Sequence, residues 1–289
     1  MMSSWYSHIC LCCVALMSVC ACSLNRIDDE MDPKPLVFEV AVSPYTKADH
    51  QYQQYPENVP FGVWAATDAG ESLLDNAKVV NDSGTWVPEN HMMWPDSGLD
   101  LLACSPHGRG VADYGSGVVF NDYDLAEGLE LMFSDELLGQ EMQSNQGKVL
   151  IRFNHALSMA RFSARATLLG GSVLKIKRID VGGVATSGSF HSLPSSAWVP
   201  GEKNGSMCFF EGDVPLGEEP LELGEVLHVI PQSSNVRISV LCDVVSGDIV
   251  LRDQTLTTEA DLFWSIGKLE SYILKIDAQL NLTIENDNR

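Results

Sequence analysis

Apolar and polar residues alternate with a period of two along most of the chain, and this pattern predicts β-strands rather than helices. Val149, Ile151 and Phe153 share one face of a predicted strand, and residues 160–168 repeat the alternation. Similar patterns or short apolar runs predict further strands over residues 36–43, 61–67, 225–231 and 236–245. Residues 124–142 are the one helical candidate, and Gly128 within them favours a turn and a short helix. The predicted fold class is therefore all-β.

The clearest alternation lies near the end of the sequence. One face is apolar from residue 274 to residue 284, with Leu274, Ile276, Ala278, Leu280, Leu282 and Ile284 on it. The residues between them are polar. This pattern predicts a single long strand with one buried face.

A length of 289 residues suits two domains, because domains of about 100 to 150 residues can each bury a core. The polar stretch 139–148 is the best candidate boundary. We expect one β-sandwich over residues 36–147 and a second over residues 148–289.

The start of the chain has the pattern of an export signal. Residues 9–22 form an apolar run that is shorter than the roughly 20 residues of a membrane-spanning helix. The run ends in Val19, Cys20, Ala21 and Cys22, which resembles a bacterial lipobox. A metal site would need four well-spaced ligands, and cysteines this close do not readily form a disulfide. We predict a lipoprotein signal peptide over residues 1–21, lipidation of Cys22, and a polar tether over residues 22–35.

Charge and motifs argue against several function classes. The sequence has 18 Lys and Arg against 39 Asp and Glu, so its net charge is −21. A negatively charged surface repels the phosphates of nucleic acid, so nucleic acid is disfavoured as a partner. The sequence has no G-x-S-x-G or H-E-x-x-H motif, so we predict no enzyme, no catalytic residue, no cofactor and no metal site. We interpret His155 as a structural residue, because no nucleophile or orienting carboxylate can be assigned to it from the sequence. Cys242 alternates in phase with Val240, which predicts a buried thiol.

Five tryptophans beyond the signal peptide are spread over both predicted halves, at positions 64, 86, 94, 198 and 264. We expect most of them to pack in the core. The alternative is an exposed pair, such as Trp86 and Trp198, on which sugars stack. The protein would then be a surface glycan-binding lipoprotein.

Several segments, in this order and behind a lipobox, resemble the fimbrillin family of Bacteroidales lipoproteins, the Mfa-like and type V pilin group. The matching segments are VPFGVWA (59–65), WPDSGLDLLACSP (94–106), FNHALSMARF (153–162), GVATSGSF (183–190) and LHVIPQ (227–232). The resemblance implies two tandem transthyretin-like β-sandwiches behind a lipoprotein signal peptide. It also implies a surface-exposed outer-membrane lipoprotein of the fimbrium, with other fimbrial subunits as partners and adhesion to host or bacterial surface ligands.

Stalk-type members of this family are cut by an arginine-specific protease after the first strand, and a neighbour's donor strand fills the groove that opens. In this sequence Arg26 precedes the first predicted strand, and Lys47 is the basic residue that follows it. Either a different protease acts, with Lys47 as a possible site, or the chain keeps its first strand and serves as a tip, anchor or accessory subunit. Leu274, Ile276, Leu280, Leu282 and Ile284 belong either to the closing strand of the chain's own sheet or to a donor strand.

Overall fold

The computed structural model describes residues 34–45, 53–113, 115–144 and 146–287. The predicted lipidation site Cys22 and the predicted processing sites Arg26 and Lys47 lie outside these residues. Strands dominate the described chain, and its only helix is the 3-10 turn η1 (Leu125–Glu127), so the all-β prediction is confirmed. Within the described residues, no helix has the length and apolar character needed to cross a bilayer.

The N-terminal strands form one sheet that closes on itself. Its members are β1 (Val37–Val42), β2 (Gln53–Gln54), β3 (Phe61–Thr67), β4 (Ser72–Asp82), β5 (Thr85–Pro88), β6 (Leu99–Ser105), β9 (Met132–Ser134), β10 (Leu137–Gln140) and β11 (Lys148–His155). The order β6-β3-β4-β5-β1-β11-β9 returns to its start because β9 also pairs with β6. The apolar faces of these strands surround a common core that includes Phe61, Val63 and Phe153. The sandwich predicted for residues 36–147 is not confirmed.

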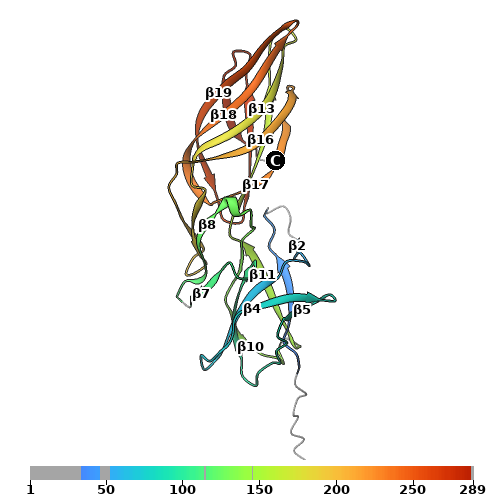
Figure 1. The fold of residues 1–289 in the computed structure, drawn as a ribbon, viewed down its shortest axis with the longest axis vertical. Helices are drawn as coiled ribbons and strands as arrows, with labels where there is room; N and C mark the ends of the chain where they lie inside the picture. Colours follow the sequence, from blue (N-terminus) through green and yellow to red (C-terminus); the bar gives the residue numbers. More distant parts are fainter. Residues whose placement is uncertain (1–33, 46–52, 114, 145, 288–289) are drawn as a thin grey trace, which may run out of the picture. The chain divides into compact units, whose positions relative to one another are not determined.

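Two four-stranded sheets enclose the core of the C-terminal half. The first contains β17 (Leu221–Val229), β12 (Ser158–Ala166), β20 (Leu269–Ile276) and β21 (Leu282–Asn286), in that order. The second contains β16 (Gly205–Leu216), β13 (Val173–Val184), β18 (Gln232–Ser246) and β19 (Ile249–Trp264), which lie side by side in Figure 1. Phe162 and Leu274 from the first sheet meet Ile176 and Val240 from the second in one core. Cys242 is buried in this core, as its alternation predicts.

A smaller sheet joins segments from both predicted halves. It contains β15 (Ala197–Pro200), β14 (Ser187–His191), β8 (Gly117–Asp124) and β7 (Val111–Asp113). Phe120 on β8 pairs with Phe190 on β14, and their rings stack with centroids 5.7 Å apart. Strands from the two sides of residue 147 therefore pair with one another, both here and between β1 and β11.

The single long strand predicted over residues 274–284 is wrong. The segment is a hairpin in which β20 and β21 pair antiparallel, so that Leu274 faces Ile284 and Ile276 faces Leu282. Between them, the Asp277 carboxylate accepts hydrogen bonds from the backbone N–H groups of Gln279 and Asn281, both at 2.9 Å. Side-chain capping of this kind stabilises a tight turn. Five of the six residues on the predicted apolar face contact the C-terminal core, and Ala278, in the turn, is not part of it. The closing-strand and donor-strand readings both stay predictions.

Candidate functional site

The first strand, β1, is hydrogen-bonded unequally along its two edges. On one edge it runs parallel to β11 in continuous register, from Val37 opposite Lys148 to Val42 opposite Phe153. On the other edge it pairs with β5 only between Phe38 and Trp86, and with β2 at Ala41 and Val42. We call the space that β1 occupies between β11 and β5 the β1 slot.

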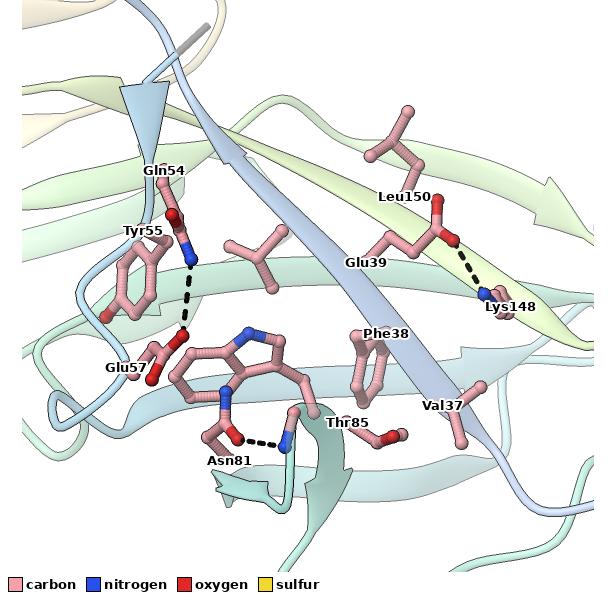
Figure 2. A pocket seen from close by; sticks show the side chains of 13 residues that line it. Val37, Phe38, Glu39, Gln54, Tyr55, Glu57, Asn81, Thr85, Lys148 and Leu150 are labelled. Carbon is pink, nitrogen blue, oxygen red and sulfur yellow. Dashed lines mark hydrogen bonds and ion pairs between the residues drawn. The ribbon is translucent and has the colours of Figure 1, made fainter.

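The two faces of β1 have opposite characters. Leu36, directly before the strand, and Phe38 and Val42 within it are at most 4% exposed and belong to the core of the closed sheet. The Phe38 ring meets Phe61 edge to face, with centroids 6.2 Å apart. On the opposite face Glu39 forms an exposed ion pair with Lys148 at 2.8 Å (Figure 2). The strand therefore inserts an apolar row into a core that the other strands build.

A hollow of about 440 Å³ lies beside β1, where the ladder to β5 is interrupted. Figure 2 shows Phe38 and Glu39 on the strand that crosses this hollow, with Tyr55 and Asn81 among the residues around it. The rim carries hydrogen bonds from the Gln54 side chain to Glu57 at 3.3 Å and from the Gly84 N–H to Asn81 at 2.8 Å. One edge of β1 thus borders an opening instead of a full neighbouring strand.

The residues that follow β1 fasten its end to the body of the protein. The Ser43 N–H donates to the Phe153 carbonyl at 2.8 Å, and the Ser43 hydroxyl donates to Asn154 Oδ1 at 2.8 Å. The Leu269 N–H, at the start of β20, lies 3.4 Å from the Tyr45 carbonyl. Contacts therefore hold residues 43–45 against both β11 and β20.

The Tyr45 side chain contacts a cluster of titratable side chains. Glu130, His155 and His228 form this cluster, which we call the anchor cluster. The Tyr45 hydroxyl donates to Glu130 Oε1 at 2.9 Å, and its ring stacks on the His155 ring with centroids 3.5 Å apart. His155 Nδ1 lies 2.8 Å from the same carboxylate oxygen, and His228 Nε2 lies 3.9 Å from it. One oxygen of Glu130 is therefore the centre of the cluster.

Burial and charge set the ionisation of these groups. Burial acts to raise the pKa of Glu130, but the contacts with His155, Tyr45 and His228 outweigh it and leave the pKa below its ordinary value. Burial, together with the Glu130 charge, raises the pKa of the Tyr45 phenol, which therefore stays protonated and able to donate. Burial lowers the pKa of His228. The cluster at neutral pH thus presents a carboxylate to a phenol donor.

The sequence assigns no carboxylate to His155, and the structure supplies one, because Glu130 Oε1 lies 2.8 Å from His155 Nδ1. Sequence gives no signal for this contact, since the two residues lie on different segments that only the tertiary fold brings together. The arrangement resembles an acid–base pair, but His155 is 4% exposed, both of its ring nitrogens are buried, and Tyr45 covers its ring. A hollow of about 510 Å³ adjoins the cluster, and its described lining contains no Ser, Thr or Cys. The geometry therefore supports a structural role for His155.

The described tryptophans lie in or against the hydrophobic cores. Trp86, Trp94 and Trp264 are buried, and the half-buried Trp198 packs on a core and donates its indole N–H to the Ala156 carbonyl at 2.6 Å. A sugar platform made of Trp86 and Trp198 is therefore a wrong prediction, because Trp86 lies inside the closed sheet. Across the described ranges, no group of three or more His, Cys, Asp or Glu side chains is placed to bind a metal ion.

No protein-family model and no curated protein matches this sequence. Among solved structures, the chain is similar to a fimbrial protein from Bacteroides vulgatus, with a TM-score of 0.63 at 15% identity over 88% of this chain and 98% of that one. It is also similar to a protein from Bacteroides ovatus described as a candidate cell adhesion protein, with a TM-score of 0.56 at 14% identity over 89% and 96% of the two chains. A counterpart from Bacteroides uniformis, described in the same words, gives a TM-score of 0.55 at 13% identity over 88% and 97%. The chain therefore has the fold of Bacteroidales fimbrial proteins, and the resemblance to the fimbrillin family is confirmed at the level of the fold.

Proposed function

We propose that this protein is a structural subunit of cell-surface fimbriae, tethered to the outer membrane through a lipid on Cys22 and joined to other subunits by β-strand complementation. The observation that carries the proposal is the placement of β1. This strand has a full parallel ladder on one edge, a broken ladder on the other, and an apolar row inserted into a core built by other strands. A strand held in this way can be replaced by an equivalent strand from another chain.

The apolar row gives this replacement a driving force. Fully burying a side chain of the Leu, Phe or Val type contributes about 1.5 to 3 kcal/mol. Leu36, Phe38 and Val42 together therefore contribute roughly 5 to 9 kcal/mol, an upper estimate by area bookkeeping. A subunit without β1 would leave that apolar surface open, so occupation of the slot by a partner's strand is strongly favoured.

The position of β1 also defines what processing would do. A cut after Arg26 would leave β1 in place, because the strand begins at Val37. A cut after Lys47 would separate β1 from the rest of the chain, since the strand ends at Val42. We propose that Lys47 is the processing site that frees the slot in subunits that polymerise.

Gel electrophoresis of outer-membrane fractions tests the proposal. Subunits joined by strand complementation resist detergent and separate on heating, so we expect a ladder of oligomers that collapses to one band after boiling. Filaments that antibodies against this protein label in electron micrographs would support the same conclusion. A protein that stays monomeric in unheated samples, with no labelled filament, contradicts it.

A further inference from the structure

We infer that the anchor cluster is a receptor for a tyrosine side chain carried by whichever strand fills the β1 slot. The partner strand is then recognised by two features at a fixed spacing, an apolar row and a phenol. The inference rests on the proposed function, because it states the chemistry of the strand that replaces β1.

The contacts of Tyr45 show what the receptor recognises. Its hydroxyl donates to a carboxylate at 2.9 Å, and its ring lies nearly parallel to His155, with 22° between the planes. The His228 ring lies on a second side, with its centroid 6.4 Å away. A flat ring with a hydroxyl group meets all three contacts, whereas an aliphatic side chain meets none of the polar ones.

The cluster is poorly satisfied without a phenol. His155 is 4% exposed, and Tyr45 shields its ring by stacking on it, with centroids 3.5 Å apart. Glu130, 34% exposed, would lose its hydroxyl donor, and His155 would be left facing the adjoining hollow of about 510 Å³. Removing the hydroxyl donor of a half-buried carboxylate is costly, so a strand that brings no such donor is disfavoured.

The register of β1 fixes where the phenol must lie. Val42 pairs with Phe153, and the next residue donates to the Phe153 carbonyl, so Tyr45 reaches the cluster three positions beyond the last buried valine. The resulting pattern has apolar residues nine, seven and three positions before a tyrosine, as in residues 36–45. No other tyrosine of the printed sequence has apolar residues at these spacings. The 274–284 segment of a second copy contains no tyrosine, so the fitting partner is a subunit whose donor strand carries this pattern.

Peptide exchange on the full mature chain tests the inference. A single protease site is introduced within residues 46–52, the chain is cut there, and a labelled synthetic peptide of residues 34–47 replaces β1. The dissociation rate is measured after a chase with unlabelled peptide. We expect Tyr45→Phe in the peptide to raise the rate about 10-fold or more, because it removes a hydrogen bond to a charged group. The matched peptide Glu39→Gln changes only the exposed face and should dissociate like the native peptide.

A variant of the receptor tests whether the difference between the Tyr and Phe peptides depends on Glu130. In a receptor carrying Glu130→Ala, the Tyr and Phe peptides should dissociate at rates within about twofold of each other, because the acceptor is gone. Equal rates for the two peptides on the native receptor would overturn the tyrosine receptor and leave strand replacement intact. A Tyr-to-Phe difference that persists in the Glu130→Ala receptor would also overturn it. Failure of every peptide to enter the cut protein would overturn both the inference and the proposed function.

Discussion

Replacing Phe38 with alanine tests how much of the closed sheet depends on β1. Phe38 is 3% exposed, lies in the middle of the apolar row and contacts Phe61 edge to face. Truncating a buried phenylalanine typically costs about 3 to 5 kcal/mol, which includes the cavity that remains and the loss of the aromatic contact. Folded domains are stable by about 5 to 15 kcal/mol, so this one change should remove a large part of that margin.

Urea denaturation of the uncut protein measures the effect. With a slope of about 2 kcal/mol per molar urea, a loss of 4 kcal/mol lowers the unfolding midpoint by about 2 M. Hydrogen exchange read by mass spectrometry gives the location: β3 should exchange faster in the variant, while β18, in the C-terminal core, should change little.

Glu39→Ala is the matched control, since it lies next to Phe38 on the same strand with its side chain on the opposite face. Its ion pair with Lys148 joins side chains that are 56% and 57% exposed, and pairs of this kind contribute about 0 to 1 kcal/mol. If Phe38→Ala costs no more than Glu39→Ala, β1 does not hold the closed sheet together, and the argument for an inserted strand is refuted.

Three further predictions concern the anchor cluster, the thiols and the proposed lipid on Cys22. Glu130→Gln should destabilise the protein at neutral pH, and the stability difference between variant and native protein should shrink as the pH falls below 4.5. A carboxylate whose pKa is lowered by folding contributes stability above its unfolded pKa and loses this contribution when it is protonated. A stability difference that stays constant between pH 7 and pH 3 in thermal melts would contradict this. A maleimide should label Cys208 in the native protein, and Cys104 and Cys242 only after unfolding. Those two thiols are buried, and burial raises their pKa values to about 12 and about 11. Fast labelling of all three in the native protein, read by mass spectrometry, would show that the cores are open. Cys22→Ala should abolish incorporation of a palmitate analogue in cells, and undiminished label in this variant would refute the lipid anchor.

The sequence predicted the elements whose apolar pattern is local. Val149, Ile151 and Phe153 do lie on one buried face of β11, and Cys242 is buried on β18 as its phase requires. Period-two alternation marks the buried face of any strand that packs on a core, so it predicts that face whatever the order of the strands in the sheet.

The same signal failed at the C-terminal hairpin, because alternation continues in phase across a short turn. Leu274 and Ile284 face the same core from opposite arms, so the pattern reads as one strand. The turn residues gave the missed sign: Asp277 and Asn281 are both turn formers, and Asp277 accepts hydrogen bonds within the turn.

The anchor cluster was beyond sequence reasoning for a different reason. Tyr45, Glu130, His155 and His228 come from four separate segments, and no spacing links them. Their meeting depends on β1 lying parallel to β11 and on β17 pairing with β12, which are long-range pairings that local patterns do not specify.

The proposed replacement of β1 is tested most directly by the N-terminus of this protein in any filaments that contain it. Filaments are purified from cells, dissociated by heating, and the subunit is sequenced from its first residue. Polymerised subunits should begin after Lys47, with residues 36–45 lost and a partner's strand recovered in the same filaments. Polymerised subunits that all begin at Cys22 or Ile27, and so keep β1, would contradict the account.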